Sequence, residues 1–289
     1  MQIKVVCLKN CSIHFKIPQQ IFALALKILV KIVIINIEYR ARGKIMDQDQ
    51  NVQKLREAIK NAHRIVVLTG AGISVPSGIP DFRSATGLYS TPFGAFHPEE
   101  MISHEFYVLH KKEFYEFYKQ KMLYPDAKPN PAHIFLAKLE EQGKLSAVIT
   151  QNIDGLHQAA GSKRVLELHG SVHRNYCEKC GKFFDLDYII KSDGVPKCPC
   201  GGAIKPDVVL YGESLDTDIL MKSINALRSA DLFIVIGTSL AVYPAAGLVD
   251  YYGGRIKAVV NKSSTPYDAY ADIVINDDCA KVFKVLDLD

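Results

Sequence analysis

The sequence has little excess charge of either sign. Its 35 lysines and arginines nearly balance 31 aspartates and glutamates, so the formal net charge is +4. Proteins that bind nucleic acids usually carry a concentrated basic face, and a charge this small offers no argument for one. We therefore expect no specific nucleic-acid partner. Internal repeats and low-complexity tracts are also lacking, and the composition is typical of a globular protein.

A typical signal peptide is lacking as well, although residues 21–37 are strongly apolar. This segment of about 17 residues is at the lower limit for a membrane helix. Its Lys27 and Lys31 would each cost about 2.5–3.5 kcal/mol near the bilayer centre, so a membrane anchor is disfavoured. We interpret residues 1–46 as a dispensable extension with Met46 as the true start; the alternative is an additional packed element.

Cysteines are few, and four of the seven cluster in one segment. They are Cys177, Cys180, Cys198 and Cys200. Two closely spaced thiol pairs suit a tetrahedral four-sulfur zinc site with no open position for water. In a chain without a typical signal peptide, such pairs favour metal binding in a reducing compartment over disulfides. The sequence therefore predicts one structural zinc ion and a cytoplasmic location. A nucleic-acid-binding ribbon is the alternative, but acidic residues balance the lysines of this segment.

Apolar segments alternate with amphipathic ones along most of the chain. Residues 51–62, 131–142 and 216–228 have the apolar spacing of helices. Short apolar runs occupy residues 64–69, 145–149, 165–168, 232–236, 256–260 and 273–275. Apolar strands that alternate with helices are typical of a parallel sheet covered on both faces. We therefore predict an α/β fold built on a parallel sheet.

Two segments interrupt this alternation. Residues 86–130 are rich in aromatic and charged side chains, which favours helices inserted beside the main sheet, and residues 174–205 carry the clustered cysteines.

A glycine-rich turn, GAGIS (70–74), follows the first apolar strand, and GIPDFR (78–83) comes soon after it. Glycines at such a turn let the backbone approach a pyrophosphate, and a following helix would offer free N–H groups. The spacing departs from the Gly-x-Gly-x-x-Gly of dehydrogenases, and a plain tight turn is the alternative interpretation.

Polar or glycine residues lie just past the ends of four of the predicted strands. They are Gly70, Gln151, Gly237 and Asn261. In open α/β sheets, ligands bind outside the carboxyl ends of the strands, at the point where the strand order reverses. The sequence therefore predicts a dinucleotide site at this edge of the sheet.

A reactive cluster should reach the same edge. Asn152 and Asp154 follow one strand, and His169 follows the next. A histidine near its ordinary pKa of about 6.5 can accept a proton at neutral pH, and Gly170 would let a ligand come close to it. His157 is better explained by packing, because a lone histidine is more often structural.

From about residue 51 to its end, the chain resembles the sirtuins, the NAD-dependent protein-lysine deacylases. The matching motifs are GAGIS (70–74), GIPDFR (78–83), TQNIDGLH (150–157), HG (169–170), the four cysteines, PDVVLYGE (206–213), GTSL (237–240) and VNKSSTP (260–266). The resemblance implies a catalytic domain over residues 47–289. Its large part would be a Rossmann-like parallel-sheet domain at about residues 51–85, 145–173 and 206–289. Its smaller domain would be made of a helical insertion at about 86–144 and a zinc ribbon at about 174–205. NAD and an acyl-lysine peptide would enter between them from opposite sides.

The resemblance also implies roles for single residues. His169 would be the general base, supported by Asn152 and by Asp154, which would bind the nicotinamide amide. Contacts to NAD would come from Ala71, Gly72, Asp81, Phe82, Arg83, Gln151, Asn152, Ile153, Asp154, Gly237, Thr238, Ser239, Asn261 and Asp278. An acetyl-lysine peptide would add as a strand, with contacts from Val209, Tyr211, Gly212, Glu213, Val242 and Tyr243.

The implied reaction transfers the acetyl group from lysine to ADP-ribose. The acyl oxygen attacks C1′ of the nicotinamide ribose, nicotinamide departs, and His169 then removes a proton from the ribose diol. The 2′-oxygen would then attack the imidate carbon, and water would complete the transfer. The products would be free lysine, nicotinamide and O-acetyl-ADP-ribose. The alternative is another NAD-consuming activity: mono-ADP-ribosyl transfer, longer-chain deacylation or NAD hydrolysis.

The acyl group itself can be predicted in part. Sirtuins that favour acidic acyl groups resemble one another in a Tyr-x-x-Arg pair on the helical insertion. The best match here is Tyr115-x-x-Tyr118, without the arginine. A buried succinyl carboxylate would lack its cation, which is costly, so we expect acetyl-lysine to be preferred over succinyl-lysine.

Overall fold

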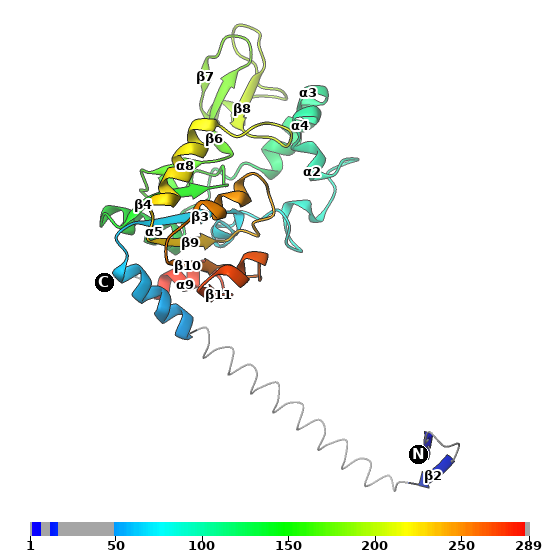
Figure 1. Ribbon diagram of the computed structural model, residues 1–289. Coiled ribbons are helices and arrows are strands. Elements are labelled where there is room, and N and C mark those ends of the chain that lie inside the picture. Colours follow the sequence, from blue (N-terminus) through cyan, green and yellow to red (C-terminus); the bar gives the residue numbers. More distant parts are fainter. Residues whose placement is uncertain (1, 7–11, 17–48, 287–289) are drawn as a thin grey trace. The chain divides into compact units, whose positions relative to one another are not determined.

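The computed structural model describes residues 2–6, 12–16 and 49–286 (Figure 1). The chain divides into two compact units, Met1–Gln50 and Asn51–Asp289. In the first unit, β1 (Gln2–Val6) pairs antiparallel with β2 (Ser12–Lys16). The apolar segment at residues 21–37 and Met46 lie outside the described residues. Among the helices of the described part, none has the length and apolar character needed to cross a membrane.

Six parallel strands form the centre of the second unit. They are β3 (Ile65–Thr69), β4 (Leu145–Thr150), β5 (Val165–Glu167), β9 (Leu232–Ile236), β10 (Ile256–Val260) and β11 (Ile273–Ile275). Their order across the sheet, β11-β10-β9-β3-β4-β5, is that of a doubly wound fold, which reverses between β3 and β9. Every residue of β3 and β9 is buried. The predicted α/β fold with a parallel sheet is confirmed.

Helices cover both faces of this sheet, and successive side chains of β9 show it. Ile234 packs in one apolar cluster with α5 (Pro131–Glu141), α9 (Cys279–Val285) and the helix at residues 51–61. Phe233 packs in another with α8 (Thr217–Ser229) and the 3₁₀ helix η4 (Ala245–Tyr251). Full burial of an aliphatic or aromatic side chain stabilises a fold by about 1.5–3 kcal/mol, so this two-sided core dominates the second unit.

A smaller part lies beside the large sheet (Figure 1). Its antiparallel sheet has the order β7-β6-β8, formed by β6 (Gly170–Cys177), β7 (Phe183–Phe184) and β8 (Ile204–Val208). The helices are α2 (Pro98–Met101), α3 (His104–Leu109), α4 (Lys111–Lys121) and α7 (Leu186–Lys191). α4 buries Phe114, Tyr115, Phe117 and Tyr118 in a third apolar cluster. The zinc-ribbon segment and the inserted helices therefore share one core.

The position of α5 differs from the expectation that residues 86–144 belong to the small part. Phe135 and Leu136 of α5 pack in the core of the large sheet, with the Phe135 and Phe283 rings 5.1 Å apart. Asn130 begins the helix: its side chain accepts from Ala132 N, and its backbone N–H reaches the His133 ring. Since α5 leads directly into β4, it covers the sheet as the crossover helix between β3 and β4.

Candidate active site

The polar residues expected at the strand ends do meet at one edge. Thr69, at the end of β3, is in register with Thr150 of β4 and Ile236 of β9, and Ile236 is in register with Val260 of β10. Gly70, Gln151, Gly237 and Asn261 each follow one of these four residues directly. Two of them flank the point where the strand order reverses, which is where doubly wound folds bind ligands.

The two glycine turns at this edge pack directly on each other. Gly72 N donates to Gly237 O at 2.8 Å, and a Cβ on Gly72 would lie 2.7 Å from that oxygen. Gly237 has φ +62°, and its Cβ would lie 2.3 Å from Ile73 N. The contact between the turns therefore already requires glycine here. The expected helix after the first turn is only two short 3₁₀ turns, η1 (Ala71–Ile73) and η2 (Val75–Ser77).

Side chains connect the ends of β4 and β9. Gln151 Nε2 donates to Thr238 Oγ1 at 3.0 Å, and Leu240 N donates to the same oxygen at 3.1 Å. Thr238 is buried, whereas Ser239 is exposed. Gln151 and Thr238 thus brace each other across the switch point and leave Ser239 open to a ligand.

Asn152 and Asp154 share a partner to which sequence reasoning assigned no role. The buried Ser74 hydroxyl donates to Asp154 Oδ2 at 2.7 Å and accepts from Asn152 Nδ2 at 3.0 Å. Leu156 N donates to Asp154 Oδ1 at 2.9 Å. Burial raises the pKa of Asp154, while these donors oppose that rise. Ser74 closes the GAGIS motif, and a small hydroxyl residue there was the only available signal.

His169 is held as a neutral base. Its Nδ1 lies 2.9 Å from the carbonyl oxygen of Gln151. A carbonyl only accepts, so Nδ1 carries the proton and Nε2 keeps a free lone pair. Burial lowers the pKa of His169 below its usual range, although the hydrogen bond to Gln151 opposes the change. The imidazole is therefore unprotonated at neutral pH, as a general base requires.

His157 lies in the core, as expected from sequence. It is 1% exposed, its Nε2 lies 3.0 Å from Thr69 Oγ1, and its ring centre is 4.8 Å from that of His133. Burial lowers the pKa of His157 to about 3 and that of His133 to about 4. Both rings are neutral packing elements beneath the site.

The PDFR segment forms a turn capped by its own carboxylate. Asp81 Oδ1 accepts from Arg83 N at 3.1 Å and from Ser84 N at 2.8 Å. Phe82 packs on Tyr89 with ring centres 5.5 Å apart, and the exposed Arg83 guanidinium lies 5.9 Å from the centre of the same ring. The structure brings these residues together as a compact loop beside the small part's core.

Two further residues expected at the cofactor make local hydrogen bonds at the same edge. Asn261 Nδ2 donates to Ser263 O at 2.6 Å. Asp278 begins α9, where its Oδ1 accepts from Ala280 N at 2.8 Å and Lys281 N at 3.2 Å. Cys279, the first residue of α9, directs its thiol at Gly72 O, 3.7 Å away. These contacts place the start of α9 against the first glycine turn, at the same edge as Gly70.

Val209, Tyr211, Gly212 and Glu213, which are expected to contact a peptide, follow β8, whereas Val242 and Tyr243 come after β9. Tyr211 and Tyr89 hydroxyls lie 3.0 Å apart, and Glu213 Oε2 accepts from Lys205 Nζ at 3.1 Å and Leu210 N at 3.0 Å. Burial raises the pKa of Glu213, but these donors outweigh it and hold the pKa below its usual value. The side chain of Glu213 is thus occupied internally. Val209 N donates to His169 O at 3.0 Å, whereas Tyr243 is 77% exposed.

The four clustered cysteines fit a zinc ion. Their sulfur atoms all lie within 4.8 Å of one another, and neighbouring Sγ atoms are 3.5–3.7 Å apart. Four thiolates about 2.3 Å from a tetrahedral zinc stand about 3.8 Å from each other. The four cysteines are free thiols in this structure, as the prediction of a metal site over disulfides requires.

The comparisons with known proteins agree with this geometry. The Sir2 family model matches residues 70–244. An NAD-dependent protein deacetylase of Clostridium perfringens is 56% identical over 83% of this chain and 100% of its own length, and one of Clostridium tetani is 55% identical over 82% and 96%. A Sir2 structure with a p53 peptide and NAD+ shares 43% identity and a TM-score of 0.71, covering 81% of this chain and 95% of its own. The chain belongs to the Sir2 family.

Proposed function

We propose that this protein removes acetyl groups from protein lysines in a reaction that consumes NAD. The observation that carries the proposal is the His169 ring, whose Nδ1 bonds to Gln151 O and whose Nε2 is left to accept a proton. It stands at the edge where Ser74, Asn152 and Asp154 form one network. Relatives named NAD-dependent protein deacetylase, 55–56% identical over more than four-fifths of this chain, support the same activity.

Bound NAD supplies an electrophilic ribose carbon with nicotinamide as its leaving group. Asp154, held by Ser74, accepts from the nicotinamide amide, with Asn152 and Ile153 beside it. Gln151, Thr238, Ser239 and Asn261 hold the remainder together with Ala71, Gly72, Asp81, Phe82, Arg83, Gly237 and Asp278. The acetyl oxygen of the substrate replaces nicotinamide at the ribose carbon. His169 Nε2 then takes a proton from a ribose hydroxyl, which can attack the acetyl carbon, and water completes the transfer and releases lysine. Base catalysis of this kind contributes about 10²–10⁴-fold.

The acetyl-lysine peptide is proposed to add as a strand between Gly212-Glu213 and Val242-Tyr243. Backbone pairing provides affinity without strong sequence selectivity. Val209 and Tyr211 line the lysine stem. A zinc ion held by the four cysteines would have no open position, so it supplies structure and no chemistry. Free clustered thiols also support our placement of the chain in the cytoplasm, a reducing compartment.

The test is an assay of an acetylated peptide with and without NAD, with products identified by mass spectrometry. We expect O-acetyl-ADP-ribose, nicotinamide and free lysine, and none of them without NAD. ADP-ribose formed without loss of peptide acetylation would instead identify an NAD hydrolase and contradict the proposal. His169→Ala should lower turnover about 10³-fold while NAD binding, measured by calorimetry, persists. The matched control is His63→Ala, an exposed histidine outside the site.

A further inference from the structure

A bulge in β6 lies beside the active site. β6 and β8 pair at Gly170–Val208 and Ser171–Asp207, and the next pair is Asn175–Pro206. Because Asp207 and Pro206 are consecutive, residues 172–174 form an extra segment between two successive pairs. Bulges concentrate next to active sites, where they redirect side chains. Each residue of this one makes a contact that bears on the site.

The first two residues of the bulge hold the backbone around Asp154. Val172 N donates to Ile153 O at 3.0 Å. His173 Nε2 lies 3.1 Å from Asp154 O, so this nitrogen donates. The ring also packs tightly on Gly155, where an added Cβ would lie 2.6 Å from Nε2. The position of the bulge therefore sets the position of Asp154.

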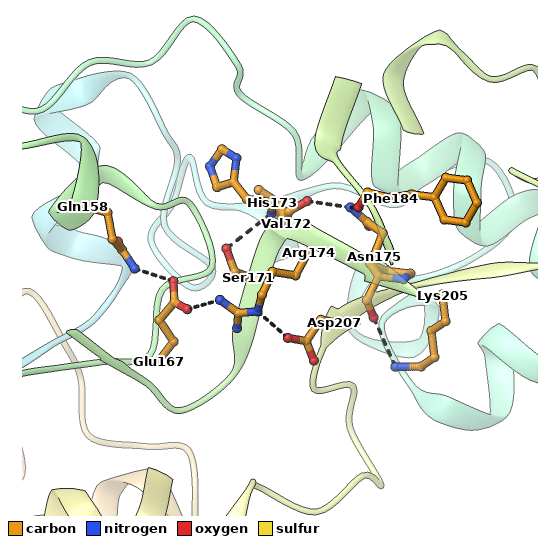
Figure 2. Close-up of polar contacts among 11 residues, drawn as sticks. Gln158, Glu167, Ser171, Val172, His173, Arg174, Asn175, Phe184, Lys205 and Asp207 are labelled. Carbon is orange, nitrogen blue, oxygen red and sulfur yellow. Dashed lines mark hydrogen bonds and ion pairs between the residues drawn. The ribbon is translucent and has the colours of Figure 1, made fainter. Parts of the chain in front are cut away.

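The third residue, Arg174, joins two strands through its guanidinium (Figure 2). Arg174 Nη1 donates to Glu167 Oε2 at 2.6 Å, and Nε donates to Asp207 Oδ2 at 2.7 Å. Glu167 also accepts from Gln158 Nε2 at 2.8 Å, and its side chain is only 9% exposed. A rigid guanidinium can direct separate donors at two carboxylates, which the single ammonium of lysine does less well.

These two carboxylates come from the segments that flank His169 in the chain and in the strand pairing. Glu167 ends β5, two residues before His169, and Asp207 is paired with Ser171, two residues after it. Arg174 thus spans the short connection that carries the base from the large sheet into the small one. The same bulge holds the backbone of Ile153 and Asp154 through Val172 and His173, contacts that do not involve the Arg174 guanidinium.

We propose that Arg174 is a positioning residue for the deacetylation, an inference that rests on the proposed function. By linking Glu167 to Asp207, it closes the bulge and fixes His169 relative to the Ile153–Asp154 backbone. A displacement of about 1 Å in such a site can cost about 100-fold in rate. Arg174 acts through the groups that it orients.

The experiment compares Arg174→Met with Arg228→Met, which removes an arginine of α8 that stacks on Tyr251. Acetyl transfer needs the proton removal by His169, whereas exchange of labelled nicotinamide into NAD precedes it. We expect Arg174→Met to lower acetyl transfer by about tenfold or more and nicotinamide exchange by less than about threefold. Arg228→Met should change neither rate, and Arg174→Lys should recover part of the lost acetyl transfer.

Equal losses of both rates in a folded Arg174→Met protein would indicate a merely structural role and overturn the inference, as would no loss in either. Circular dichroism at the assay temperature establishes folding. If Arg174→Met does not fold, Glu167→Gln removes one charge of the network and provides the same comparison of the two rates, with the same outcomes.

The His169 ring gives a readout that needs no turnover. Nitrogen-15 chemical shifts report whether Nδ1 keeps its proton toward Gln151 O. Altered His169 shifts in Arg174→Met, but not in Arg228→Met, support the positioning role, and unaltered shifts in both overturn it. A wild-type chain inactive on acetylated peptides would refute the proposed function and leave this spectroscopic test decisive for Arg174.

Discussion

The large parallel sheet and the small antiparallel sheet are stabilised in different ways. In β3 and β9 every residue is buried, because helices cover both faces of the large sheet. In β6, by contrast, His173 and Tyr176 are exposed, and the small part relies on the aromatic side chains of α4 and on four thiols placed for a metal.

The active site is built from both parts, and each part positions a different set of its residues. The large sheet supplies strand ends whose relative positions are fixed by register, including Gln151 and Gly237. His169 lies on the connection from β5 to β6, where the two kinds of stabilisation meet. A well-packed frame thus holds one half of the site, and a metal-dependent part influences the other.

Removal of the metal should produce the largest difference between the two parts. Cys180→Ser removes one of the four thiolate ligands and should therefore lose zinc. In zinc-finger peptides, zinc binding supplies about 10–16 kcal/mol of folding free energy. We expect activity to fall more than about 100-fold and amides of β6–β8 to exchange rapidly, while those of β3 and β9 stay protected. Zinc content and hydrogen exchange measure this. Cys279→Ser, outside the cluster, should keep one zinc, and full activity in zinc-free Cys180→Ser would contradict the expectation.

Core truncations in the two parts sharpen the comparison. Ile234→Ala in β9 should lower the free energy of unfolding by about 2–5 kcal/mol, and Phe117→Ala in α4 by about 3–5 kcal/mol. Both side chains are 0% exposed. Hydrogen exchange should show Ile234→Ala weakening the whole second unit and Phe117→Ala mainly the small part. Met221→Ala, 47% exposed in α8, should cost less than about 0.5 kcal/mol. A uniform loss of protection in both variants would show one cooperative core.

Acid should destabilise the large part through its buried histidines. The pKa values of His133 and His157, about 4 and about 3, lie below the value of about 6.5 of an unfolded histidine. Between these values the unfolded chain binds more protons. The contribution of the two histidines is therefore complete above about pH 6.5 and is lost as the pH falls to their folded pKa values of about 4 and about 3.

With two such histidines, the free energy of unfolding should change by at most about 2.7 kcal/mol per pH unit. Urea unfolding at a series of pH values measures it. His133→Phe should reduce the slope by about 1.4 kcal/mol per pH unit, which corresponds to one proton. His63→Gln, at an exposed position, should leave the slope unchanged. An unaltered slope in His133→Phe would show that this ring is not neutral in the folded protein.

The smallest expected effect concerns the acyl group. Tyr115 donates its hydroxyl to Ile204 O, and Tyr118 is buried in the same aromatic cluster, so this pair offers no cation to a succinyl carboxylate. We expect kcat/KM for acetyl-lysine to exceed that for succinyl-lysine by about tenfold or more, because an unpaired charge is costly to bury. Parallel assays of the two peptides decide the matter, and a higher kcat/KM on succinyl-lysine would refute the expectation.

Local patterns in the sequence determined the elements, the four-cysteine cluster and the edge of the sheet where the site lies. Continuous apolar runs such as residues 232–236 are stable only in a strand that is buried on both faces of the sheet. Two close thiol pairs are typical of a single metal site. The residues after the strands then meet at one edge because parallel strands share a direction.

Only the tertiary structure decided which side chains become partners across long sequence distances. The hydroxyl of Ser74 joins Asn152 and Asp154. Gly72 and Gly237 pack so closely that neither position has room for a Cβ, which their sequence motif alone does not reveal. α5 likewise covers the large sheet, although it adjoins the inserted helices in sequence. Periodicity and motifs describe neighbours along the chain, whereas the β6 bulge and the bridge from Glu167 through Arg174 to Asp207 exist only once separate strands are registered in space.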